Sequence, residues 1–81
     1  MTKAEIAALM TEALDAQAGD LAGAPAELVS VDVTILAQAA EGAVSTRLLR
    51  KTKTLLFMEG ELTRGDGVRA AIATSVHKIG A

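Results

Sequence analysis

Four basic residues gather within seven positions of the chain. Arg47, Arg50, Lys51 and Lys53 lie in the stretch "RLLRKTK". Such a cluster creates a local positive field that can attract a phosphorylated ligand, although the pI of the whole sequence is about 5.2. Lysine and arginine at a strand end also discourage edge-to-edge aggregation while they stay solvated. The cluster is therefore interpreted either as a phosphate contact or as a solvated strand terminus.

Other groups that could do chemistry are few. The chain has one histidine, His77, and no cysteine, so no metal site is expected. A serine-histidine-acid triad would need a serine beside His77, and no motif marks one. Glu59 and Glu61 alternate with apolar residues and are interpreted as a solvent-facing row rather than an acid pair. Isolated carboxylates elsewhere in the chain remain the candidates for acid-base chemistry.

Length and composition predict one small domain, residues 1–81, that associates with itself. Apolar residues make up 51% of the chain, but 17 residues are alanines, which bury little area. A chain this short has difficulty burying enough surface alone, so a homo-oligomer is expected. No disulfide framework, signal peptide or membrane-spanning run is present in the sequence, so a cytoplasmic protein is expected.

Charge is distributed unevenly along the chain. Residues 1–42 hold seven acids and one base, whereas residues 43–81 hold seven bases and three acids. Nucleic acid is a poor candidate as a partner, because single-strand binders need aromatic stacking platforms and duplex binders need a broad basic face. The chain has one aromatic residue of the Phe, Trp and Tyr group.

A helix is expected over about residues 2–18. The sequence "TKAE" forms a capping box in which Thr2 and Glu5 cap each other's backbone amides. Gly19 and the "GAP" at residues 23–25 are expected to end the helix. The residues that recur at helical spacing, and so should face a core, are Ile6, Leu9, Met10, Ala13, Leu14 and Gln17.

After Pro25 the periodicity changes to two, which predicts strands at about 28–36, 43–50, 53–63 and 68–79. In the first of these, Val29, Val31, Val33 and Ile35 should share one face. The sequence "RGDG" predicts a hairpin between the last two strands. Short connections favour an antiparallel meander. The fold class is therefore α+β, with one long helix packed on a four-stranded antiparallel sheet.

Small residues form the side of the predicted helix opposite its apolar stripe, with one carboxylate in the middle. The members of this face are Ala4, Ala8, Thr11, Asp15 and Ala18. Small residues allow another backbone or a ligand to approach closely, so this side is interpreted as a contact face onto which Asp15 projects. The alternative is that alanine is merely a good helix former and that Asp15 is solvated.

The segment from Leu28 to Ile79 resembles the four-stranded second half of hotdog-fold acyl-CoA thioesterases, particularly the phenylacetic-acid-degradation type. The resemblance rests on "LVSVDVTIL", on "EGAVSTRLLRKTKTLLFMEGEL" and on "GDGVRAAIATSVHKI". It extends to the helix, which takes the place of the family's central helix. It implies a curved sheet wrapped on that helix, subunits joined edge to edge, and active sites at the dimer interface.

The resemblance also implies site residues. In the family a carboxylate on the central helix acts as base or nucleophile, and Asp15 is the nearest match, with Glu12 second. The family's basic turn near the coenzyme A entrance corresponds to Arg50, Lys51 and Lys53, with Arg47 in the same cluster. Coenzyme A would be part of the substrate, and no separate cofactor is implied.

Two features of the family are missing from the sequence: a strand before the helix and a His-Gly-Gly type turn whose amides polarise the thioester carbonyl. The leading hypothesis is hydrolysis of an acyl-CoA thioester with Asp15 as base or nucleophile. The alternative is a non-catalytic hotdog-like domain that binds acyl-CoA or serves only as an oligomerisation module.

Overall fold

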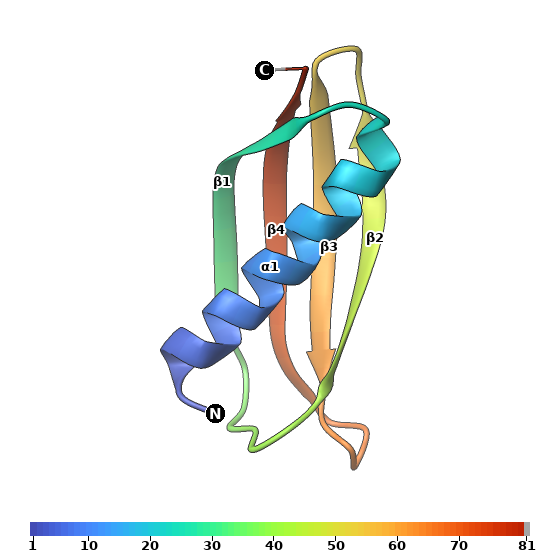
Figure 1. Cartoon of the computed structure of the whole chain (residues 1–81). Helices are drawn as coiled ribbons and strands as arrows, with labels where there is room; N and C mark the ends of the chain where they lie inside the picture. Colours follow the sequence, from blue (N-terminus) through green and yellow to red (C-terminus); the bar gives the residue numbers. More distant parts are fainter. Residues whose placement is uncertain (81) are drawn as a thin grey trace.

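One helix covers one face of a four-stranded antiparallel sheet (Figure 1). A computed structural model describes residues 1–80 of the chain. The expected arrangement of a helix packed on a four-stranded antiparallel sheet is confirmed. In chain order the elements are α1 (Lys3–Ala22), β1 (Ala26–Ile35), β2 (Ala43–Lys51), β3 (Leu55–Thr63) and β4 (Arg69–Ile79).

Helix α1 begins with the expected capping box. The Thr2 hydroxyl accepts a hydrogen bond from the Glu5 amide at 3.1 Å, and the Glu5 carboxylate accepts one from the Thr2 amide at 2.8 Å. The helix ends at Gly23, which adopts the left-handed conformation with φ 65°. It continues four residues beyond the expected end near residue 18, because Gly19 is tolerated inside the helix at a cost of about 1 kcal/mol.

The face of α1 that packs on the sheet differs from the expected stripe. Its buried residues, Ile6, Met10, Leu14 and Ala18, follow one another at intervals of four. Leu9, expected in the core, is 36% exposed, whereas Ala18, expected on the opposite side, is completely buried. The helix crosses the strands obliquely (Figure 1), so the sheet meets an i, i+4 row. Asp15, adjacent to this row, therefore lies on the flank of the helix.

The strand order is β1-β4-β3-β2, with every neighbouring pair antiparallel. The expected meander holds for β2, β3 and β4 but is wrong for β1, which pairs with β4. The loop of residues 36–42 therefore crosses from one edge of the sheet to the other. Three strand spacings of about 4.8 Å make about 14 Å, and seven residues can span more than about 20 Å.

A β-bulge changes the phase of β1. Its pairing with β4 shifts register between Leu28 and Ser30, so Val29 leaves the inner face and is 60% exposed. The prediction that Val29 shares a face with Val31 is therefore wrong, and Leu28 takes its place toward the helix. A bulge inserts one residue without changing the apolar composition, so alternation alone does not reveal it.

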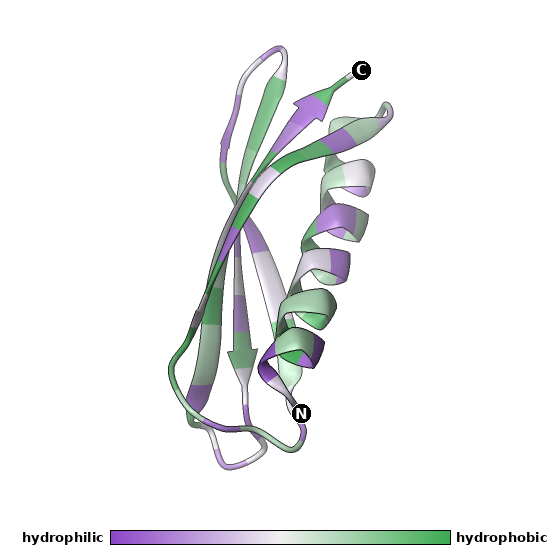
Figure 2. Ribbon diagram, turned by 90° about the vertical axis from the view of Figure 1, so that its left-hand side faces the viewer, coloured by the Kyte–Doolittle hydropathy of each residue, from purple (hydrophilic) through white to green (hydrophobic). Residues whose placement is uncertain are grey.

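The two faces of the sheet are different in character. Residues of β3 alternate, with Leu56, Met58, Gly60 and Leu62 buried on the side of the helix, and Figure 2 shows α1 on that side alone. On the outer face, Glu59 and Glu61 pair with Arg47 at 3.0 Å and Arg69 at 3.4 Å. The solvent-facing interpretation of the two glutamates is thus confirmed.

The "RGDG" hairpin joins β3 and β4 as expected. The Arg64 amide donates to the Val68 carbonyl at 2.8 Å, and Gly67 takes φ 87°. Arg64 also pairs with Asp66 at 2.6 Å, and this hydrogen-bonded contact lowers the pKa of Asp66 to about 2. The exposed hairpin tip is thus held by an ion pair between residues two apart.

The observed helix face makes a stability prediction that separates Leu14 from Leu9. Leu14→Ala removes a completely buried side chain and should lower the free energy of unfolding by about 2 to 5 kcal/mol. Leu9→Ala, on the same helix, should lower it by clearly less, because Leu9 is 36% exposed and leaves no enclosed cavity. Urea denaturation followed by circular dichroism measures both. Equal losses in the two variants would contradict the observed packing of α1.

Candidate functional site

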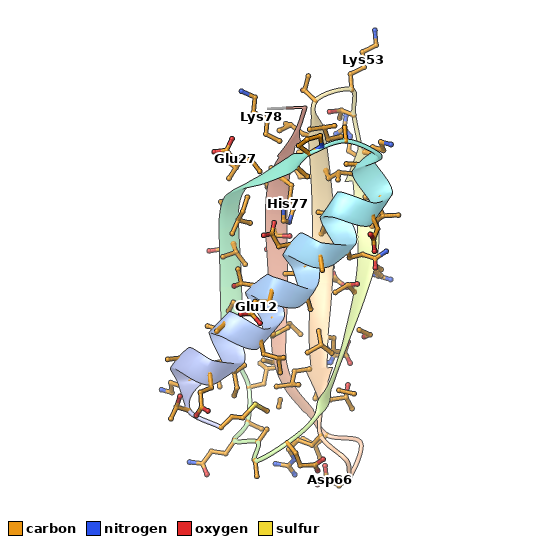
Figure 3. All side chains as sticks on the ribbon, viewed as in Figure 1. Glu12, Glu27, Lys53, Asp66, His77 and Lys78 are labelled. Carbon is orange, nitrogen blue, oxygen red and sulfur yellow. The ribbon has the colours of Figure 1, made fainter. Side chains whose placement is uncertain are left out.

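Asp15 and His77 meet beneath the flank of α1. The Asp15 side chain is 53% exposed, and its Oδ1 lies 3.4 Å from Nδ1 of His77. His77 belongs to β4 and is completely buried, and Figure 3 shows its side chain over β4, beside the helix. A carboxylate open to solvent thus approaches an imidazole that is closed to it.

Strand β4 gives His77 a second polar neighbour. Ser75 lies two residues earlier, on the same face, and its hydroxyl oxygen is 2.9 Å from His77 Nε2. Leu28 on β1 and Leu56 on β3 are the cross-strand partners of His77, so its surroundings within the sheet are apolar. Asp15, His77 and Ser75 therefore form a line that runs from the surface into the core.

No motif in the sequence marks a serine beside His77, yet the structure brings Ser75 next to its ring. The spacing S-x-H within a strand places both side chains on one face, and this was the available signal in the sequence. The assignment of Asp15 to a face opposite the apolar stripe concealed the contact with His77. Ser75 is 3% exposed, so the line does not present its hydroxyl to a substrate as a nucleophilic triad would.

Burial decides the charge of His77. Removal from water lowers the pKa of the imidazole, and the nearby Asp15 carboxylate opposes that shift. Asp15, on α1, is the charged residue within the described chain that acts on this pKa, since Leu28 and Leu56 face the ring from the neighbouring strands. The imidazole is therefore neutral at neutral pH.

Glu12, the second candidate carboxylate, has different surroundings. It is exposed on α1, and Figure 3 shows it projecting away from the sheet. The structure therefore places Glu12 in solvent and Asp15 at the boundary between solvent and core. Of the two, Asp15 is the carboxylate with a buried partner.

The four residues of the basic cluster, Arg47, Arg50, Lys51 and Lys53, have different partners and lie in different places. Arg47 pairs with Glu59 on the outer face of the sheet, while the Lys51 ammonium donates to the Leu21 carbonyl at the end of α1, at 3.3 Å. Lys53 lies in the turn between β2 and β3 and extends past the end of the sheet (Figure 3). Arg50 is exposed near the end of β2. Within residues 1–80, Arg50 and Lys53 form no ion pair.

The start of α1 is remote from both carboxylates. Asp15 follows Lys3 by twelve residues, or about 18 Å along the axis at about 1.5 Å per residue. The first amides of the helix are engaged in part by Thr2, whose side chain and carbonyl accept from Glu5 and Ile6. Amides at the start of this helix therefore cannot act on a carbonyl group held at Asp15 of the same chain.

Several grooves occur elsewhere on the surface, two of them larger than about 500 Å³. One, of about 530 Å³, lies on the outer face of the sheet around the Arg47–Glu59 and Arg69–Glu61 pairs. The other, of about 630 Å³, lies between the start of α1 and the loop after β1. Neither is lined by Asp15 or Glu12. The Asp15 side chain, 53% exposed, lies outside both of these grooves.

Solved structures share this architecture over nearly all of the chain. BH2602 from Bacillus halodurans, solved with CoA, has a TM-score of 0.86 at 14% identity, over 98% of this chain and 55% of its own. A phenylacetic acid degradation-related protein from Ralstonia eutropha gives 0.86 at 20% identity, over 98% and 62%. Mouse thioesterase superfamily member 2 gives 0.84 at 20% identity, over 99% and 66%. The chain has the hotdog fold.

The likeness is one of fold and covers part of each relative. The chain spans about 55% to 66% of the length of these three proteins. No protein-family model matches the sequence, and no curated protein matches it either. Within residues 1–80, no strand pairs with the outer edge of β1 or of β2 in this hotdog sheet.

Neither a metal-binding cluster nor a membrane-spanning helix is found among residues 1–80. Among residues 1–80, no group of three or more His, Asp or Glu side chains comes together in a way that could hold a metal ion. The same part of the chain contains no helix that is both long and apolar enough to cross a bilayer.

Burial of His77 predicts how stability depends on pH. The pKa of the folded state lies below the ordinary 6.5, so the unfolded chain takes up this proton first as the pH falls. The free energy of unfolding should therefore be insensitive to His77 above about pH 6.5 and should decrease below it, toward the folded-state pKa. Denaturant titrations between about pH 5 and 8 measure the slope.

His77→Gln provides the matched control, because it keeps a polar side chain and removes the titration. The difference in slope between the two proteins isolates His77 from the carboxylates that both share. If the free energy of unfolding of the wild type rises relative to that of His77→Gln on acidification through this range, the assignment of a buried, neutral histidine is contradicted.

Proposed function

We propose that this protein is a cytoplasmic, homo-oligomeric acyl-CoA thioester hydrolase in which Asp15 acts as general base or nucleophile. The observation that carries the proposal is the half-exposed Asp15 carboxylate beside a buried histidine, on the helix of a fold shared with thioesterase-superfamily proteins. Metal and separate cofactors have no part in the proposed reaction.

The chemistry needs a carboxylate that reaches a thioester carbonyl. As a base, Asp15 takes a proton from water, whose oxygen attacks the carbonyl carbon, and the CoA thiolate leaves when the tetrahedral intermediate collapses. As a nucleophile, it attacks the carbonyl carbon and expels the CoA thiolate, and water then hydrolyses the resulting mixed anhydride to the free acid and the regenerated carboxylate. Both routes need the carboxylate to be accessible to water and substrate, and its side chain is 53% exposed.

The neighbours and the local basic cluster support acyl-CoA as the substrate class. BH2602, which shares the fold, was solved with CoA. The phosphates of a nucleotide thioester need positive partners, and Arg50, Lys51 and Lys53 supply them at the end of β2 and in the following turn. Arg47, paired with Glu59 on the outer face, is the least suited member of the cluster.

A second copy of the chain would complete the site. The Asp15 side chain lies outside the two grooves described above, whereas a thioesterase has to enclose its acyl group. The unpaired edges of β1 and β2 and the exposed Val29, Leu36, Leu48 and Leu49 favour association. The proposed oligomer supplies the missing wall and the oxyanion donors that the start of α1 cannot provide.

The remoteness of the helix start favours one alternative. If no donor reaches the carbonyl group near Asp15, the protein is a hotdog-like domain that binds acyl-CoA, or only itself, without hydrolysis. The electrostatic stabilisation lost with one oxyanion donor is about 100- to 1000-fold in rate. The two functions therefore differ in turnover rather than in binding.

Replacing each carboxylate in turn tests the enzyme. Asp15→Asn should reduce thiol release from acyl-CoA by at least about 100-fold, with the fold and oligomer unchanged. Glu12→Gln, a matched change three residues earlier on the same helix, should leave the rate within about twofold, because Glu12 projects into solvent. The absence of cysteine means that the protein adds no background thiol. Equal effects of the two substitutions, or turnover that survives Asp15→Asn, would contradict the role of Asp15.

The basic residues make a separate prediction about binding. Arg50→Ala and Lys53→Ala should each weaken CoA binding several-fold, and more at low salt, because a contact with phosphate is lost. Arg47→Ala is the control, since Arg47 is occupied by Glu59 at 3.0 Å. Isothermal titration with CoA at two salt concentrations measures the three variants. Unchanged affinity in Arg50→Ala and Lys53→Ala would make this end of β2 a solvated strand terminus.

A further inference from the structure

The buried polar line beneath α1 has a role that the proposed hydrolysis does not use. Ser75 and His77 are 3% and 0% exposed, in a face of β4 that otherwise packs small apolar residues against the helix. A buried imidazole without hydrogen bonds costs free energy, so its two nitrogens need partners. Nε2 has the Ser75 hydroxyl at 2.9 Å, but Nδ1 has no hydrogen-bond partner and lies 3.4 Å from Asp15 Oδ1.

One arrangement of protons satisfies both contacts of a neutral ring. If Nδ1 carries the proton, it can donate to the Asp15 carboxylate, while Nε2 accepts from the Ser75 hydroxyl. If Nε2 carries the proton, the Nδ1 lone pair faces a carboxylate and the two repel. Burial lowers the pKa of His77, so the ring is neutral at neutral pH and the choice lies between these two tautomers.

We propose that His77 is a positioning residue that holds the Asp15 carboxylate through Nδ1–H, and that the Ser75 hydroxyl donates to Nε2 in the tautomer that makes this possible. The proposal about reactivity rests on the proposed role of Asp15 in hydrolysis. The separation of 3.4 Å is long for a hydrogen bond, and such contacts often tighten when substrate is bound. With Oδ1 held from below, Oδ2 faces solvent and the reacting atoms.

Two substitutions of similar size distinguish the two ends of the ring. The amide nitrogen of an asparagine at position 77 falls near the place of Nδ1, and that of a glutamine near the place of Nε2. His77→Asn therefore keeps an N–H donor toward Asp15, and His77→Gln keeps an amide group toward Ser75. We expect kcat to stay within about tenfold in His77→Asn and to fall by up to about 100-fold in His77→Gln, with KM unchanged in both.

A structural role alone predicts a different result, in which activity follows the loss of stability in both variants. The double variant Asp15→Asn/His77→Gln sharpens the comparison. If His77 acts through Asp15, His77→Gln should add nothing once Asp15 is replaced, whereas independent effects would multiply. Multiplied effects, or equal losses in His77→Asn and His77→Gln, would overturn the positioning role.

A measurement that needs no activity tests the tautomer. Because the chain has one histidine, the imidazole nitrogens give one set of ¹⁵N signals, which can be read at about pH 7.5, above the ordinary pKa of histidine. We expect the Nδ1–H form in the wild type and a shift toward Nε2–H in Asp15→Ala. The Nε2–H form in the wild type would overturn the proposal even if thioesters are hydrolysed. The Nδ1–H form in a protein that does not hydrolyse thioesters would support the Asp15–His77 contact and would contradict the proposed role of Asp15 in hydrolysis.

Discussion

The contact between the i, i+4 row of α1 and the inner face of the sheet governs the rest of the molecule. Ile6, Met10, Leu14 and Ala18 lie against strands whose inner residues are leucine, methionine, alanine and glycine. Gly60 shows how close this contact is, since a Cβ atom there would lie 3.3 Å from Leu14 Cδ2. Rotation of the helix by one residue would remove Leu14 from the sheet. The same rotation would separate Asp15 from His77.

This packing turns an ordinary surface carboxylate into a site with a defined partner. Asp15 follows Leu14 in sequence, so burial of Leu14 brings the next side chain to the margin of the sheet. His77 reaches the same margin because β4 is a central strand, flanked by β1 and β3, and its inner face lies under the helix. Core packing and the candidate chemistry therefore depend on the same geometry, and a variant that loosens one should disturb the other.

Local sequence patterns predicted the elements but not how they combine. The capping box, the alternation of β3 and the Asp-Gly hairpin depend on residues close in sequence, and all three occur as expected. The pairing of β1 with β4, the bulge at Val29 and the exposure of Leu9 depend on contacts across the fold. The contact between Asp15 and His77 joins residues 62 positions apart through the angle at which α1 crosses the sheet, which the period of the helix does not specify.

The most direct test of the proposed site is a crystal structure with a non-hydrolysable acyl-CoA analogue. In this analogue a methylene group replaces the thioester carbonyl, which leaves a thioether. If Asp15 is the reacting carboxylate, the acyl end should lie at a subunit interface, with the reacting position within about 3.5 Å of Asp15 or of a water bound to it. The nucleotide phosphates should lie near Arg50 and Lys53. An analogue bound in the groove on the outer face of the sheet, remote from Asp15, would contradict the central claim.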